Sequence, residues 1–445
     1  MKRSIFWAVL SAGILFLLTG ASAGAQDFNK AKLDSVLVSL EKNNKFMGGI
    51  ALMRDGQLIY AKNTGFSDVA KQTKANENTR YRIGSITKTF TAVLVMKANE
   101  EGRLNLDETL DKYFPGIANA AKITIRHLLT HRSGIHNFTN DASYQTWYTA
   151  PKTRSELVKT ITDAGSDFEP GSKFSYSNSG FVLLSFILED IYKTSYAHLV
   201  QEKIVKPLGL LYTSVGGKIN AETNEARSYT FTQGWTLEKE TDMSVPMGAG
   251  AIVSTPTDLV RFSEALFSGK LVGLTAVEEM KKLKDNVGSG LITFPFYDRT
   301  EFGHSGGIDG FSSLFSYDPE KRIAFAMISN GMNYNGNDLT IAALSAAYNK
   351  PYQVPLFSSY KATEEELDKL LGNYTSKEIG LKITIAREGT TLFAKIEGQG
   401  SRPLAAIDKN KFADDAAGVN VVFQPEQQTF TLSQHGRSFN FSKAL

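Results

Sequence analysis

Arg82-Ile83-Gly84-Ser85-Ile86-Thr87-Lys88 is the most informative segment of this chain, because apolar residues recur at helical spacing after it as far as Gly102. We expect a helix over 87–102, with Ser85 at its start. A lysine three positions after a serine lies on the same helical face, where a partly neutral amine can take the hydroxyl proton. The first residue of a helix also keeps a backbone N–H that can face a developing oxyanion. The segment therefore predicts Ser85 as a nucleophile and Lys88 as a candidate base.

Spacing alone does not single out Ser85, because Ser39 and Ser358 also have a lysine three positions later. Two further motifs support it, Tyr176-Ser177-Asn178 and His304-Ser305-Gly306; Tyr-x-Asn and His-x-Gly each occur once in the chain. Tyr176 could be a buried core tyrosine bonded to backbone. In the catalytic interpretation its phenol passes a proton to the leaving group, and Asn178 offers an amide to a substrate carbonyl.

The surrounding pattern predicts an α+β domain over 26–350. Alternating runs at 48–53 and 57–62 around Asp55-Gly56 indicate a hairpin, and 310–330 indicates a second hairpin around Asp318-Pro319-Glu320-Lys321. Helical patterns flank these strands at 33–43, at 338–348, and in a run to Phe267 that begins with a capping signal at Ser254 to Asp258. Residues 105–245, with helices expected at 125–130, 155–163 and 180–192, are interpreted as a mainly helical insertion. We therefore expect an antiparallel sheet flanked by helices.

A second domain is predicted at the C-terminal end. The chain has 445 residues, more than one hydrophobic core usually supports. Pro351 and Pro355 mark a linker, assigned to 351–361, and a short helix follows at 364–371. Strand patterns then occur at 381–386, 391–396, 419–423, 429–433 and 438–441. We expect 362–445 to form a small all-β domain, either a meander or a barrel.

The first 25 residues have the composition of a secretory signal. Lys2 and Arg3 precede a mostly apolar run, and small residues at 21–25 offer two cleavage sites. An uncleaved anchor is the alternative, but the apolar run is short for a membrane span. We expect a mature protein that is periplasmic or secreted, with no stable membrane span. The chain has no cysteine and a net charge of only +3, so neither a disulfide framework nor nucleic-acid binding is indicated.

Together with Ile125-Arg126-His127-Leu128-Leu129-Thr130-His131-Arg132-Ser133-Gly134, the three motifs resemble the serine hydrolases related to class C β-lactamases and DD-peptidases. The resemblance covers about residues 30 to 350 and implies the β-lactamase/transpeptidase-like fold. It implies that Ser85 is acylated and that Lys88 and Tyr176 share the roles of general acid and general base. It also implies an oxyanion hole formed by the N–H groups of Ser85 and Gly307. The third motif, His304, Ser305 and Gly306, would bind the substrate or assist proton transfer, and Asn178 would bind substrate. No cofactor or metal is implied, and the tail resembles a small lipocalin-like barrel.

The third motif departs from that of the penicillin-destroying members, and this departure narrows the range of expected substrates. Penicillin-destroying members usually carry Lys-Thr-Gly as the third motif, which is absent here, and a largely neutral His304 is a weaker carboxylate anchor than lysine. We therefore expect hydrolysis of D-amino-acid-containing peptides, of the DD-carboxypeptidase or D-aminopeptidase type, or of small esters. The substrate would be a small molecule or peptide, with peptidoglycan fragments as candidates. A class C-like β-lactamase is the alternative, and a non-catalytic peptide or β-lactam sensor is an alternative of another class.

Two other kinds of site compete with this interpretation. Gly303-His304-Ser305-Gly306-Gly307 fits the Gly-x-Ser-x-Gly elbow of α/β-hydrolases, but that elbow requires a strand leading into a helix, whereas a strand pattern follows Gly310. His127 and His131 lie four residues apart and could bind zinc, although no glutamate follows His127. We interpret both histidines as structural.

Overall fold

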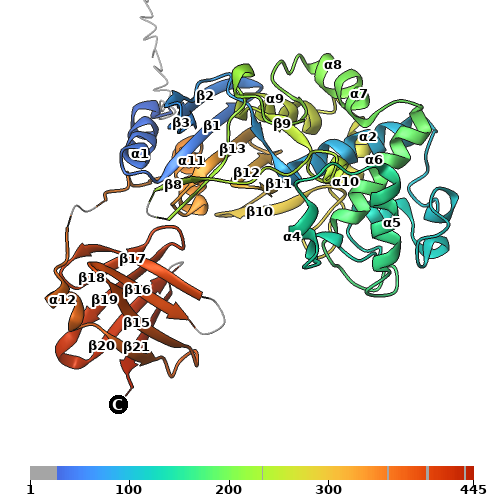
Figure 1. Ribbon diagram of the computed structural model, residues 1–445. Helices are drawn as coiled ribbons and strands as arrows, with labels where there is room; N and C mark the ends of the chain where they lie inside the picture. Colours follow the sequence, from blue (N-terminus) through green and yellow to red (C-terminus); the bar gives the residue numbers. More distant parts are fainter. Residues whose placement is uncertain (1–27, 233, 358–359, 397–399, 435–436, 445) are drawn as a thin grey trace, which may run out of the picture.

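The computed structural model describes residues 28–232, 234–357, 360–396, 400–434 and 437–444. The predicted signal segment 1–25 lies outside these residues. Within the described part of the chain, no helix is both long enough and apolar enough to cross a membrane. Figure 1 shows a sheet with helices on both sides, a helical region beside it, and a separate barrel reached through the linker.

The central sheet contains both predicted hairpins. Its strand order is β10-β11-β12-β13-β1-β2, with antiparallel pairing throughout. These strands are β10 (Ile292–Phe296), β11 (Arg299–Ile308), β12 (Phe311–Asp318), β13 (Ile323–Met332), β1 (Phe46–Arg54) and β2 (Gln57–Thr64). Asp55 adopts a left-handed φ of 50° in the turn between β1 and β2, as a tight hairpin requires. The prediction of an antiparallel α+β domain is confirmed.

Helices cover both faces of this sheet, so its central strands are buried on both sides. Helices α1 (Lys30–Lys42) and α11 (Gly336–Ala347) pack on one face, and α9 (Pro256–Phe267) packs on the other (Figure 1). Along β13 the side chains alternate between two cores: Phe325 and Met327 join α1 and α11, whereas Ala326 and Ile328 join the core shared with α9. This double coverage explains the nearly continuous apolar sequence of β1 and β13.

The nucleophile segment runs from a short strand into a buried helix. After β5 (Tyr81–Arg82), a 3-10 turn (Gly84–Ile86) leads into α2 (Thr87–Glu100), and Gly102 follows with a φ of 67°. The predicted helix is therefore present, and Ser85 lies in the turn at its start. Helix α2 packs against α6 (Asn178–Tyr192), whose first residue belongs to the second motif. Packing of these two helices brings the first two motifs together.

The predicted insertion is less purely helical than expected. It contains α3 (Ile125–Leu129), α4 (Tyr144–Trp147), α5 (Arg154–Ala164), α6, α7 (Tyr196–Val200) and α8 (Lys206–Leu208). It also contributes β7 (Tyr229–Phe231), which pairs with β13 and with β8 (Trp235–Leu237), and β6 (Ser214–Val215), which pairs with β9 (Ile252–Ser254). These strands are two or three residues long, too short for alternation to reveal them.

The C-terminal domain is a closed barrel. After α12 (Glu364–Asp368) its strands are β14 (Gly372–Thr375), β15 (Lys382–Glu388), β16 (Thr391–Ile396), β17 (Gly400–Asp408), β18 (Lys411–Asp414), β19 (Val419–Gln424), β20 (Thr429–Gln434) and β21 (Arg437–Lys443). The sequence predicted five of them and missed β14, β17 and β18. Buried aromatic side chains, among them Phe412, Phe423 and Phe430, fill the interior.

Candidate active site

Ser85 and Lys88 are in direct contact, as their spacing predicts. The Lys88 Nζ lies 3.0 Å from the Ser85 Oγ. The same amine is 2.8 Å from the Asn178 Oδ1 and 2.8 Å from the backbone oxygen of Ala249. The first two motifs therefore meet at one nitrogen atom.

The protonation state of Lys88 follows from its surroundings. Its side chain is completely buried, and this burial lowers its pKa well below the ordinary value of a lysine. A neutral amine has two hydrogens and one lone pair. The Asn178 and Ala249 oxygens can accept the two hydrogens, which leaves the lone pair for the hydroxyl proton of Ser85. A neutral Lys88 can therefore direct its lone pair at the Ser85 hydroxyl.

The pKa of Tyr176 is shifted upward, whereas that of Lys88 is shifted downward. Burial raises the pKa of its phenol to about 12, and a hydrogen bond with Ser85 opposes this shift. The ring centroid is 4.8 Å from the Lys88 Nζ. At neutral pH the phenol therefore keeps its proton, and Tyr176 is arranged as an acid rather than as a base.

His304 is neutral at physiological pH. It is 3% exposed, and burial together with the nearby Lys88 lowers its pKa to about 4. Its Nδ1 lies 2.5 Å from the backbone oxygen of Ser305, so this nitrogen carries the hydrogen and Nε2 is the acceptor. The ring lies 6.5 Å from that of Tyr176, measured between centroids. His304 therefore lies beside the catalytic groups but brings no positive charge to them.

Close backbone packing brings Gly307 next to the nucleophile turn. A Cβ at Gly84 would lie 2.9 Å from the Gly307 nitrogen, and a Cβ at Gly306 would lie 2.1 Å from the Ile83 oxygen. Gly84 also has a φ of 49°, which favours glycine. Strand β10 pairs with β11 only between Arg299 and Gly303, so it does not cover this part of the β11 edge. The two predicted oxyanion donors thus belong to backbone segments in contact.

Asn178 is held in a defined orientation at the start of α6. Its Oδ1 faces Lys88, and its Nδ2 donates to the Thr139 Oγ1 at 2.9 Å. Its backbone N–H donates to the Asn137 Oδ1 at 3.0 Å. An amide nitrogen has two hydrogens, so one of them is available to a substrate carbonyl.

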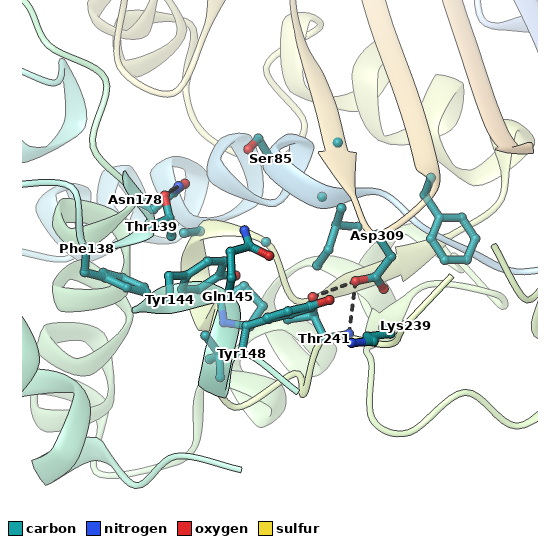
Figure 2. A pocket seen from close by; sticks show the side chains of 18 of the residues that line it. Ser85, Phe138, Thr139, Tyr144, Gln145, Tyr148, Asn178, Lys239, Thr241 and Asp309 are labelled. Carbon is teal, nitrogen blue, oxygen red and sulfur yellow. Dashed lines mark hydrogen bonds between the residues drawn. The ribbon is translucent and has the colours of Figure 1, made fainter. Parts of the chain in front are cut away.

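A pocket of about 510 Å³ is lined by Ser85, Asn178 and Gly307. Figure 2 shows Ser85 and Asn178 beside it, with Tyr144, Gln145 and Tyr148 from the α4 segment forming one wall. Further aromatic and apolar lining comes from Phe138, Val245, Pro246, Ile308 and Phe311, and the charged lining residues are Glu238, Lys239 and Asp309. Sequence analysis did not identify this wall, because an aromatic residue in a loop has no local pattern that separates a pocket wall from a core.

The predicted site residues do not all reach the pocket. Ser85, Asn178 and Gly307 line it, and Lys88 contacts two of these residues. Ser305 is exposed and follows His304 on a strand, where successive side chains point to opposite faces. The other predicted site residues are not among the lining residues of the pocket: Lys88, Tyr176, His304, Ser305 and Gly306.

The two competing sites do not fit the structure. Residues 303–307 lie inside β11, which continues through a tight turn into β12, so the strand-to-helix elbow is wrong. His127 and His131 each use Nδ1 to accept a backbone N–H, from Thr124 and Ser177 respectively. Among the described residues, no group of three or more histidine or acidic side chains could hold a metal ion.

A buried charge network that sequence analysis missed supports the site. Arg82 is completely buried and donates to the Asp309 Oδ2 at 2.8 Å and to the Glu240 Oε1 at 2.6 Å. The other Asp309 oxygen accepts from the backbone N–H and the hydroxyl of Thr241 (Figure 2). The one available signal was an arginine in an otherwise apolar lead-in to Ser85.

The chain is similar to several known proteins. Residues 34–350 match the family model described as Beta-lactamase. Penicillin-binding protein 4* of Bacillus subtilis is 25% identical over 92% of this chain and 97% of its own length. Teichoic acid D-alanine hydrolase of Staphylococcus aureus is 25% identical over 80% of this chain and 79% of its own length.

Solved structures of related proteins are also similar to this chain. D-amino acid amidase from Ochrobactrum anthropi, complexed with D-phenylalanine, has a TM-score of 0.63 and 26% identity over 71% of this chain and 98% of its own. The octameric penicillin-binding protein homologue from Pyrococcus abyssi has a TM-score of 0.66 and 25% identity, covering 93% of this chain and 100% of its own. The fold and site define a serine hydrolase. Because the family match spans most of the sequence, the protein belongs to the beta-lactamase family.

Proposed function

We propose that the protein hydrolyses D-aminoacyl amides, peptides or small esters through an acyl-enzyme on Ser85. The observation that carries this proposal is the completely buried Lys88 amine at 3.0 Å from the Ser85 hydroxyl. A serine becomes a nucleophile when a neighbouring base removes its proton, and a desolvated lysine is such a base.

In the first half of the reaction, Lys88 takes the hydroxyl proton as the Ser85 oxygen attacks the substrate carbonyl carbon. The N–H groups of Ser85 and Gly307 stabilise the negative charge that develops on the carbonyl oxygen. Tyr176 then donates its proton to the leaving nitrogen or oxygen as that bond breaks, and the Lys88 ammonium restores the proton. Asn178 donates to another carbonyl of the substrate and so fixes its orientation.

In the second half, water attacks the ester carbonyl of the acyl-enzyme. Lys88, again neutral, takes a proton from this water, and Ser85 leaves with a proton. The acid product and the free enzyme result, so atoms and charge balance over the cycle. His304 stays neutral and offers its Nε2 as a hydrogen-bond acceptor.

The charges around the pocket favour an amidase or esterase over a carboxypeptidase. A carboxypeptidase or β-lactamase has to hold the carboxylate of its substrate. The charged lining residues are Glu238, Asp309 and Lys239; Asp309 is paired with Arg82, and Lys239 is exposed. His304, with a pKa of about 4, brings no positive charge to the site. Two relatives, a teichoic acid D-alanine hydrolase and a D-amino acid amidase, make a D-aminoacyl group a reasonable acyl donor.

We also infer that the mature protein is exported to the periplasm or the medium. The basis is the composition of residues 1–25, which has the charged start, apolar run and small-residue end of a secretory signal.

Covalent labelling tests the nucleophile directly. Wild-type protein should react with a fluorophosphonate, Ser85→Ala should lose the label, and Ser305→Ala, in the excluded elbow, should keep it. Steady turnover by wild type, lost in Lys88→Met, would remove the sensor alternative. Labelling that survives in Ser85→Ala would refute the proposal.

A substrate panel tests the acyl donor. D-phenylalanine amide and D-alanine p-nitrophenyl ester should be turned over faster than a D-Ala-D-Ala peptide or a chromogenic cephalosporin. Faster turnover of the cephalosporin would instead support the β-lactamase alternative.

A further inference from the structure

His131 contacts three consecutive residues around Tyr176. Its backbone oxygen accepts from the Ser175 N–H at 3.0 Å. Its Nδ1 accepts from the Ser177 N–H at 3.1 Å. Its ring stacks on Tyr176, with centroids 4.3 Å apart and an angle of 27° between the planes. One residue thus fixes the backbone on both sides of the tyrosine and one face of its ring.

The conformation of His131 is specialised for these contacts. It is only 4% exposed and has a left-handed φ of 56°, a region that few non-glycine residues adopt and in which histidine is enriched. Because Nδ1 accepts a backbone N–H, the ring must be neutral, with its hydrogen on Nε2. Burial and the neighbouring Lys88 and His304 lower the pKa of His131 well below its ordinary value, in agreement with this tautomer.

We infer that His131 is a positioning residue for Tyr176, which holds the phenol where it can protonate the leaving group. This inference rests on the acid role proposed for Tyr176. A group that transfers a proton in the transition state has to stay within hydrogen-bond reach of the leaving atom, and small displacements are costly. The ring of Tyr176 can move through two side-chain torsions; stacking on His131 limits its tilt, and the two backbone contacts of His131 limit the position of its backbone.

Substrates with different leaving groups can distinguish a positioning role of His131 toward Tyr176 from a purely structural role of His131. An amide nitrogen must be protonated before it leaves, whereas p-nitrophenolate leaves without a proton. Loss of acid catalysis therefore lowers kcat/KM for a D-aminoacyl amide much more than for the p-nitrophenyl ester of the same acyl group. Loss of the base lowers both, because each substrate needs an activated Ser85.

The main variant is His131→Asn. Asparagine tolerates a positive φ, and its Oδ1 can replace Nδ1 as acceptor from Ser177, so only the stacked ring is lost. We expect kcat/KM for the amide to fall by about 10- to 100-fold, with a much smaller loss on the ester. Tyr176→Phe should show the same selectivity in stronger form, and Lys88→Met should lower both rates.

His127→Asn is the matched control. His127 also accepts a backbone N–H through Nδ1, from Thr124, but it belongs to the N-terminal turn of α3 and supports no catalytic group. Both rates should remain near wild type.

Equal losses on the two substrates in His131→Asn, or no loss on either, would overturn the inference while leaving Ser85 chemistry intact. A Tyr176→Phe enzyme without leaving-group selectivity would instead refute the acid role of Tyr176, and the positioning role with it.

Discussion

Arg82 and Asp309 form an ion pair of 2.8 Å between side chains that are 0% and 1% exposed. Arg82 lies three residues before Ser85, and Asp309 lies two residues after Gly307 in a left-handed turn with a φ of 53°. The pair therefore joins the segment that carries Ser85 to the strand that carries Gly307, the second proposed oxyanion donor. Thr241, which lines the pocket, is bound to the same carboxylate.

Asp309→Ala should disturb both stability and catalysis. The substitution leaves the buried guanidinium with Glu240 as its remaining acidic partner, and loss of one member of a buried pair costs about 3–5 kcal/mol. The free energy of unfolding in urea should fall by a similar amount, and kcat should fall because Gly307 is no longer tied to the nucleophile segment. Arg82→Met combined with Asp309→Ala should cost less than the sum of the two single changes. Strict additivity would contradict the coupling.

Lys88 should give the enzyme a rising pH profile. A base must be neutral to act, so kcat/KM should increase as pH rises through the lowered pKa of Lys88 and should then become level. Protonation of His304, with a pKa of about 4, should add to the loss in acid. Lys88→Arg keeps a positive charge that cannot be released and should lower kcat by about 10²- to 10⁴-fold.

Lys97→Arg is the matched control, because Lys97 lies in the last turn of the same helix, away from Ser85. Its activity should match wild type. A Lys88→Arg enzyme as active as wild type would argue against lysine as the base.

Gly306→Ala should damage the oxyanion hole without touching a catalytic side chain. The added methyl would lie 2.1 Å from the Ile83 oxygen, so β11 has to move away from the nucleophile turn. Loss of one oxyanion donor costs about 10²- to 10³-fold in kcat, and we expect a decrease of that order with little change in KM.

Gly116→Ala is the control, since a Cβ there meets no atom within 4 Å. It should retain wild-type kcat. An unchanged kcat in Gly306→Ala would mean that Gly307 is not a donor.

Local sequence signals predicted the elements that carry the catalytic groups but not the surfaces between them. The β1–β2 hairpin has a clear turn, and α9 has a threonine cap, a first-turn proline and an acid in that turn, so both were found. In the barrel, β17 was missed because Pro403 and exposed polar residues interrupt its pattern, and β18 has only four residues. These strands are fixed by closure of the barrel, which no short window records.

In the candidate site, too, some contacts follow from local sequence and others depend on packing between distant segments. Ser85 and Lys88 lie in one helical segment, so their contact followed from spacing. The stacking of His131 on Tyr176 and the wall formed by Tyr144 and Tyr148 depend on how the insertion packs against α6 and the sheet. No short stretch of sequence contains the information on how these segments pack.

Glu301 is a buried acid far from Ser85 whose protonation can be deduced from its contacts. Its Oε1 lies 2.7 Å from the Tyr348 hydroxyl, and that hydroxyl is 2.9 Å from the Asp318 Oδ2, which is paired with Arg299. The Tyr348 hydroxyl is within donating distance of both carboxylates, but one phenolic hydrogen can be donated to only one of them at a time, so the arrangement favours a Glu301 that is protonated and donates to Tyr348. Burial raises the pKa of Glu301 accordingly, against the opposing effect of the Ser316 hydroxyl.

Glu301→Gln should therefore stabilise the protein in alkali and not in acid. A carboxyl whose pKa is higher in the folded than in the unfolded state contributes stability below its unfolded pKa, and this contribution is lost as pH rises through the folded value. Glutamine supplies the same donor to Tyr348 and the same acceptor to Ser316 but cannot ionise. Between the unfolded and the folded pKa, wild type should lose up to about 1.4 kcal/mol for each pH unit relative to the variant, and above the folded pKa the difference should stay constant.

Tryptophan fluorescence can follow this effect in the catalytic domain alone, because Trp147 and Trp235 lie there and residues 362–445 contain no tryptophan. Urea unfolding at pH 4 should give equal midpoints for wild type and Glu301→Gln, and at pH 9 the midpoint of the variant should be higher. Glu77→Gln, at an exposed position, should follow wild type at both values. A variant that is less stable than wild type at pH 9 would show that folding does not raise the pKa of Glu301.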